Sequence, residues 1–326
     1  MYKWYPGSVQ LIPEIKKPKK IILSLINTIG ISPPMKQQIL ISILLIFVAL
    51  AWAGSFVVVN IATQEIDPIS LGFLRFVVAT PLLLLYLIIS KRDLSIPRKE
   101  LPSLIVLGLT GVTFLYVLQF TGIHLTNAST ASVLINTNVI FIALLSVLFF
   151  KESLGKRKIG GISLSFLGVL ITIFSNNSVE EFSTDNLFLL GSILIILCAF
   201  CWAIYSIVGK RLLEKYDAFT VITYSFILGI IFYLPFFVHE TISSTINITF
   251  NGWLAILYLS LVCAVFGYLG WYYSIERIET SKAAVFLTFI PLFAIILSFF
   301  YGEPITIFFI MGAFLIISGV YLTQKN

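Results

Sequence analysis

The chain of 326 residues is 59% hydrophobic and only 11% charged, with a mean hydropathy of +1.02. Soluble domains carry about 25% charged residues, so this balance excludes an ordinary soluble protein and predicts one embedded in lipid. The net charge of +6 comes from 21 basic and 15 acidic residues, and their positions decide whether it marks a nucleic-acid surface or a membrane orientation.

Residues 1–37 are basic and precede the first long apolar run. The stretch from Ile21 to Ile31 has the length of a signal-peptide core, but the Ser-Pro-Pro that follows is not an A-x-A cleavage site. We predict a cytoplasmic N-terminal extension in which KKPKKIILSLINTIG lies on the inner membrane surface as a passive anchor.

Ten apolar runs follow, most of them close to the roughly 20 residues that a helix needs to cross a bilayer. They are continuous rather than alternating, which is the pattern of membrane helices. The runs cover residues 39–62, 68–90, 102–124, 128–150, 159–175, 187–209, 218–238, 252–275, 283–301 and 304–323. The predicted fold is an all-α polytopic membrane protein with ten transmembrane helices.

The basic residues fall almost entirely on one side of these helices. Of the 21 Lys and Arg residues, 20 lie in the extension, in alternate loops or at the C-terminus, and the remaining one is Arg75. The intervening loops have none, so the positive-inside rule predicts a multi-pass cell-membrane protein with both termini cytoplasmic. Orientation explains the net charge, and we expect no nucleic-acid partner.

The second half of the chain repeats the first at an offset of about 150 residues. Trp52 matches Trp202 and Asp67 matches Asp217 at offset 150, while Tyr116 matches Tyr268 at offset 152. We therefore predict two five-helix repeats, at 38–175 and 187–326, joined by an external linker at 176–186. An odd number of helices per repeat inverts the second copy, and inverted repeats are typical of carriers that bind substrate between the halves.

Several motifs in this repeat resemble a known family. They are the W-x-x-x-F at Trp52, the looser W-x-x-Y at Trp202, the Arg75-Phe76 pair, and the run WYYSIERIETSKAAVFLTFIPLFAIILSFFYGEPIT. Over about residues 38–323 the chain resembles the ten-helix EamA-type carriers of the drug/metabolite transporter superfamily. The resemblance implies a small-molecule permease that exports amino acids or related metabolites. Pro291 implies a bend in the ninth helix, whereas Val139 stands at the matching position of the fourth.

Polar and aromatic side chains within the apolar runs are the candidate binding residues, because lipid cannot satisfy polar groups and they turn inward. Ser129, Ser132 and Asn136 fall on one face of a regular helix. Packing or a place at the membrane interface is the alternative for each candidate. The predicted substrate-binding residues are Trp52, Asn60, Arg75, Tyr116, Gln119, Ser132, Asn136, Trp202, Tyr268 and Trp271.

Arg75 lies seven residues inside its predicted helix, where a charge costs about 2.5–3.5 kcal/mol. Two interpretations stay open, and our hypothesis is the structural one, with contact to ligand only secondary. As a structural residue, it binds helix-end carbonyls or the loop acids Glu65 and Asp67 and orders the outer end of the cavity. As a binding residue, it holds a carboxylate or phosphate of the substrate.

The sequence therefore predicts a secondary transporter that moves a small metabolite by alternating access, with export as the expected direction. No acidic residue lies mid-membrane, which favours a facilitator or exchanger over a proton pump. We expect no cofactor, metal or catalytic residue, since no phosphate-binding loop occurs and His239-Glu240 lacks the second histidine of a zinc site. A channel, a receptor and a membrane enzyme are the alternatives, and a homodimer is an open possibility.

Overall fold

The computed structural model describes residues 33–91, 96–126, 128–151, 155–174, 186–239, 248–299 and 307–324, and all regular elements within these ranges are helical. Of the predicted N-terminal extension, residues 1–32 lie outside the description. The same holds for residues 176–185 of the predicted external linker.

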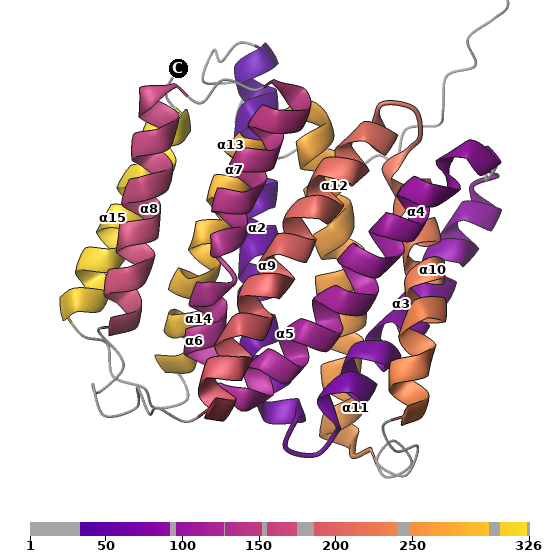
Figure 1. Cartoon of the computed structure of the whole chain (residues 1–326). Helices are drawn as coiled ribbons and strands as arrows, with labels where there is room; N and C mark the ends of the chain where they lie inside the picture. Colours follow the sequence, from indigo (N-terminus) through magenta and orange to yellow (C-terminus); the bar gives the residue numbers. More distant parts are fainter. Residues whose placement is uncertain are drawn as a thin grey trace, which may run out of the picture. The chain divides into compact units, whose positions relative to one another are not determined.

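The helices follow the apolar runs of the sequence (Figure 1). In the first half they are α2 (Pro33–Ala62), α3 (Pro68–Ile89), α4 (Leu101–Gly108), α5 (Phe114–Leu125), α6 (Ala128–Leu134), α7 (Thr137–Phe150) and α8 (Lys156–Phe174). In the second half they are α9 (Asn186–Leu213), α10 (Ala218–His239), α11 (Phe250–Leu257), α12 (Gly267–Arg277), α13 (Thr280–Val285), α14 (Phe289–Phe299) and α15 (Ile307–Gln324). A single 3-10 turn, Arg98–Glu100, precedes α4.

Six helical stretches within the described ranges are long and apolar enough to cross a bilayer. They are Gln37–Ala62, Pro68–Ile89, Arg98–Leu125, Leu187–Leu213, Ala218–His239 and Phe250–Arg277. Shorter apolar helices cover Thr137–Phe150, Thr280–Ala294 and Ile310–Gly319. The chain is therefore an all-helical, multi-pass membrane protein, while the number of ten spanning helices stays a prediction.

Two aspartates begin corresponding helices of the two halves. A carboxylate oxygen of Asp67 accepts a hydrogen bond from the Ser70 amide at 2.8 Å, and Pro68 occupies the first turn of α3. The Asp217 carboxylate accepts one from the Phe219 amide at 2.9 Å at the start of α10. These caps satisfy amides that have no partner within the helix, which fixes where α3 and α10 begin.

A π-helical segment interrupts the third spanning stretch of each half. Leu109–Thr113 joins α4 to α5, and Tyr258–Phe266 joins α11 to α12. In the first segment the Thr113 hydroxyl bonds the Gly108 carbonyl at 3.3 Å and the Gly229 carbonyl of α10 at 3.0 Å. Side-chain bonds of this kind satisfy carbonyls that the wider helical turn leaves without a regular partner.

The next stretch of each half is broken as well. A turn at Ile135 and Asn136 separates α6 from α7, and a 3-10 turn, Phe286–Thr288, separates α13 from α14. The Asn136 side-chain amide donates to the Ser132 carbonyl at 2.7 Å. That carbonyl is the regular helical partner of the Asn136 backbone amide, so the side chain competes with the helix at this point. The first-half break thus occurs without a proline.

Within residues 43–326, helices of the two halves pack against each other. Helices α5 and α7 lie against α9, α3 and α4 lie against α10, and α8 lies against α15 (Figure 1). A Cβ on Gly168 of α8 would lie 2.7 Å from the Gly312 carbonyl oxygen, and one on Gly319 would lie 2.6 Å from the Gly161 carbonyl oxygen. The glycines therefore pack α8 against α15 inside one chain, and the question of a homodimer stays untested.

Candidate functional site

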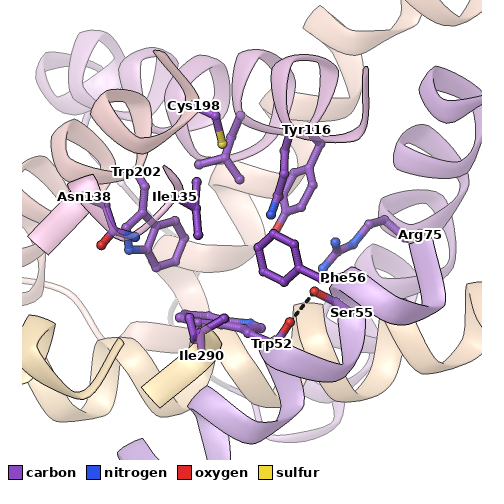
Figure 2. Close-up of a pocket in the computed structure, with 12 residues that line it drawn as sticks. Trp52, Ser55, Phe56, Arg75, Tyr116, Ile135, Asn138, Cys198, Trp202 and Ile290 are labelled. Atoms are coloured by element: carbon purple, nitrogen blue, oxygen red, sulfur yellow. Dashed lines mark hydrogen bonds between the residues drawn. The ribbon is translucent and has the colours of Figure 1, made fainter. Parts of the chain in front are cut away.

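A cavity lies among α2, α3, α5, α9 and the broken helices α6–α7 and α14. It contains about 460 Å³ of empty space, a figure that includes the part open to the outside. Twelve of the described residues line it: Trp52, Ser55, Phe56, Arg75, Leu115, Tyr116, Gln119, Ile135, Asn138, Cys198, Trp202 and Ile290. Both halves of the chain thus contribute side chains to one cavity (Figure 2).

Two tryptophans, Trp52 on α2 and Trp202 on α9, form an aromatic wall. Their rings meet edge to face with centroids 5.0 Å apart, a favourable aromatic geometry. The Trp52 indole Nε1 donates to the Cys263 carbonyl at 3.0 Å, which fixes the ring. The Trp202 Nε1 is buried and has no hydrogen-bond partner among the described residues. The indole N–H of Trp52 therefore has a hydrogen-bond partner, whereas that of Trp202 has none among the described residues.

Arg75 is 1% exposed and lines the cavity from α3. Its guanidinium carbon lies 4.2 Å from the ring centroid of Tyr116, 5.1 Å from that of Phe76 and 5.8 Å from that of Phe120. Cation–π attraction to these rings holds the group in place. Its Nε and Nη2 atoms have no hydrogen-bond partner among the described residues.

The acids that the sequence offered as partners for Arg75 are engaged elsewhere. Asp67 caps α3 through the Ser70 amide. The Glu65 carboxylate accepts a hydrogen bond from the Thr249 hydroxyl at 2.5 Å. Among the described residues Arg75 has no ion pair, so its charge is held by aromatic rings alone.

Helix α5 contributes Tyr116 and Gln119, whose side chains line the cavity one turn apart. The Tyr268 hydroxyl donates a hydrogen bond to the Gly111 carbonyl oxygen at 2.5 Å. It is also hydrogen-bonded to the Tyr116 hydroxyl at 3.0 Å. This bonded set links α5 to α12, so the cavity side of α5 is positioned by a contact between the halves.

Asn138 is a lining residue that the sequence interpretation missed. It is 3% exposed, and its Oδ1 has no hydrogen-bond partner among the described residues. The expected face of Ser132 and Asn136 assumed an unbroken helix, and the turn at Ile135 and Asn136 rotates α7 so that Asn138 faces the cavity instead. The available signal was a second asparagine within an apolar run, because burying a polar side chain in the membrane is costly and such residues are usually functional.

Five of the ten predicted residues do not line this cavity. Asn60 is exposed, and Asn136 lines a separate small pocket with Val139 and Thr288. Ser132 is fully buried one turn from Asn136. Tyr268 and Trp271 are also fully buried.

The position that corresponds to the cavity in the second half is filled by aromatic rings. Tyr205 stacks on Tyr272 at 5.1 Å and on Trp202 at 5.4 Å. The Trp271 indole donates to the Ser206 hydroxyl at 3.2 Å. The two halves are thus related in sequence but differ in packing, with open space beside Arg75 and close packing beside Tyr205.

Ion pairs link elements at the basic end, where α9 ends and α10 begins. Lys158 of α8 pairs with Glu279, which precedes α13, and Lys215 pairs with Glu100 at 3.0 Å. Lys210 also donates to the Ile278 carbonyl at 3.3 Å. Partial burial alone raises the pKa of Glu279, but the bonds with Lys158 and Lys282 outweigh it and lower that pKa below its ordinary value.

Comparisons with known proteins point to one family. The model of the EamA-like transporter family matches residues 39–174 and again residues 189–324. A protein of Archaeoglobus fulgidus named uncharacterized transporter is 39% identical over 286 residues, which are 87% of this chain and 97% of that protein. A probable amino-acid metabolite efflux pump of Escherichia coli K12 is 26% identical, over 86% of this chain and 93% of that protein.

One solved crystal structure has a similar fold, with a TM-score of 0.73 over 87% of this chain and 96% of the other. The two sequences are 15% identical, so this likeness concerns the fold alone. The double match of the family model covers most of the chain, and the helical membrane fold and the relatives agree with it. The chain is a multi-pass membrane protein that belongs to the EamA-like transporter family.

Proposed function

We propose that the chain is a secondary transporter that moves a small metabolite across the cell membrane by alternating access. The cavity beside Trp52, Trp202 and Arg75 is its substrate site. The observation that carries this proposal is that one cavity is lined by both sequence halves, including Trp52 and Trp202, which match at offset 150. Carriers built from inverted repeats bind substrate at such an interface.

The proposal includes two inverted five-helix repeats, at 38–175 and 187–326, with ten spanning helices in all. Several paired features support it: the caps at Asp67 and Asp217, the two π-helical segments, and the two broken helices. The family model also matches the chain twice over stretches of equal length. With the basic loops inside, both termini are cytoplasmic.

The unequal packing of the two halves supports alternating access. The cavity lies seven residues into α3 from Pro68, near the end that carries Glu65 and Asp67. At the basic end, the Lys158–Glu279 ion pair ties the halves together, and Tyr205 stacks on Tyr272 within the second half. In an inverted repeat these contacts exchange their roles between two states, so we assign this structure to an outward-facing state of the carrier.

The relatives suggest a substrate class and a direction. The Escherichia coli relative is named a probable amino-acid metabolite efflux pump. By extension, we propose that this chain exports amino acids or related compounds. The twelve lining residues that the structure describes include no Asp, Glu or His, which favours a facilitator or exchanger, because carboxylates and histidines are the usual proton carriers within membranes.

An export screen followed by counterflow tests the function. The medium of cells with and without the protein is compared by mass spectrometry, and the exported compound is then loaded into proteoliposomes. A carrier gives saturable uptake that internal substrate accelerates. Flux that rises linearly with concentration would indicate a channel, and conversion of the compound to a new product would indicate an enzyme.

A further inference from the structure

We propose that Arg75 is the anion-binding group of the cavity and that the substrate is a small organic acid whose carboxylate binds the Nε and Nη2 edge of its guanidinium. This inference rests on the proposed function, since it names the chemistry of the same site. Arg75 is the one charged residue among the twelve described residues that line the cavity. The cavity therefore favours an anionic ligand over a cationic one.

The free atoms of Arg75 are the pair that suits a carboxylate. Nε and Nη2 lie on one edge of the planar guanidinium, and their N–H bonds point the same way, so that the two oxygens of one carboxylate can accept both. These two atoms are buried and have no hydrogen-bond partner among the described residues. Buried donors without a partner are costly, so a bound carboxylate gains by satisfying them.

The aromatic contacts of Arg75 hold it ready for a ligand. The ring of Tyr116 faces the guanidinium at 4.2 Å, and Phe76 and Phe120 lie at 5.1 and 5.8 Å. Cation–π contacts use the face of the group and leave its edge free. The side chain is thus already ordered before binding, which reduces the entropy that binding would otherwise cost.

The opposite side of the pocket fits an uncharged polar group. Figure 2 shows Trp202 and Asn138 across the pocket from Arg75. The Trp202 Nε1 is a donor without a partner and the Asn138 Oδ1 an acceptor without one, both among the described residues. A hydroxyl or amide, which donates and accepts at once, is the kind of ligand group that matches this donor and this acceptor. Phe56 and Ile290 also line the pocket and suit an apolar body.

Binding of three matched probes to the detergent-purified full chain tests the proposal. The probes are 3-phenylpropionate, its neutral amide 3-phenylpropionamide, and the cation phenethylamine, and binding is followed by tryptophan fluorescence and thermal stability. We expect the carboxylate to bind at least about tenfold more tightly than the other two, the effect of one charge-assisted pair. Equal affinity for the amide, or no binding of the carboxylate up to about 10 mM, well above the millimolar affinity of weak ligands, overturns the proposal.

Variants locate the anion site. Arg75→Gln should weaken carboxylate binding at least about tenfold, and Arg75→Lys should keep the preference for the carboxylate over the amide while losing affinity, because it keeps the charge and loses the fork. Arg211→Gln is the matched control, since Arg211 is exposed on α9 and lies over Phe149 outside the cavity. Carboxylate binding that survives unchanged in Arg75→Gln refutes the assignment.

Failure of this inference is distinguishable from failure of the transport proposal. Binding needs no membrane, whereas counterflow needs proteoliposomes. Carboxylate binding that depends on Arg75, together with linear flux of the exported compound, would keep the anion site and reject the carrier. Saturable counterflow of a cation, with no carboxylate binding, would keep the carrier and reject the anion site.

Discussion

Gly111 is the point where the two halves approach most closely around Tyr205, and Gly111→Ala should disturb that contact. A Cβ at this position would lie 2.0 Å from Cδ2 and 2.2 Å from Cε2 of Tyr205, whereas ordinary contact begins at 3.4 Å. The ring would have to retreat by about 1.4 Å. It is fully buried and stacked against Tyr272 at 5.1 Å and Trp202 at 5.4 Å, so it has little room to move.

The expected cost is the difference between two opposing terms. Overpacking of a tightly filled interior costs about 1–3 kcal/mol, and the trapped ring places this substitution near the upper value. Replacing glycine by alanine in a helix returns about 1 kcal/mol. A net loss of about 2 kcal/mol remains, which corresponds to a fall in melting temperature of about 3 °C for a chain of this size.

Melting in detergent, followed by intrinsic tryptophan fluorescence, measures this fall. Gly160→Ala is the matched control, because its Cβ would meet only Leu322 Cδ2 at an ordinary 3.6 Å, and it should melt at or slightly above the wild-type temperature. In a Tyr205→Leu background the cost of Gly111→Ala should largely disappear, which gives a coupling energy for the pair. If Gly111→Ala melts together with Gly160→Ala, the close approach argued from Tyr205 is wrong.

Three further outcomes are expected. Tyr268→Phe removes the hydroxyl bonded to the Gly111 carbonyl at 2.5 Å and to the Tyr116 hydroxyl at 3.0 Å, so it should cost about 1 kcal/mol in a melting experiment; an unchanged melting temperature contradicts this. Because the folded-state pKa of Glu279 is lowered, its pair with Lys158 stabilises fully above the ordinary glutamate pKa of about 4.3 and loses this as the pH falls through the lowered value. Glu279→Gln should therefore reduce stability at neutral pH by about 1 kcal/mol or less, and a difference from wild type that does not shrink as the pH falls would argue against the ion pair. Single cysteines replacing Ser178 and Ser153 in a cysteine-free background should label from outside and inside respectively, and labelling of both from one side would contradict the proposed topology.

The helices were predictable from the sequence because apolar runs and capping residues act locally. The run at 68–90 became α3, Pro68–Ile89, and the run at 218–238 became α10, Ala218–His239. Both begin beside an aspartate that caps the helix. The break after Leu134 was not visible in the hydropathy of the run at 128–150, since it comes from the competition of the Asn136 amide for one backbone carbonyl.

Part of the candidate site was predictable because polar and amphipathic side chains within apolar runs turn away from lipid. Trp52, Arg75, Tyr116, Gln119 and Trp202 were expected to face inward, and all line the cavity. Asn138 was missed because the break before it changes the helical phase.

Tyr268 and Trp271 match Tyr116 and Gln119 in the repeat, yet they lie in close packing rather than beside open space. A sequence that repeats cannot indicate which of two corresponding positions is open, because that depends on how the halves pack together. Their contact with substrate stays a prediction.

The π-helical segment Leu109–Thr113 sets the rotational register of everything that follows it in α5. At 3.6 residues per turn, one residue more or less turns the downstream helix by about 100°. Deleting a single residue such as Val112 would restore a regular α-helix and carry Tyr116 and Gln119 off the cavity together. The aromatic support of Arg75 and the amide beside it therefore depend on one surplus residue of backbone, four to seven positions away.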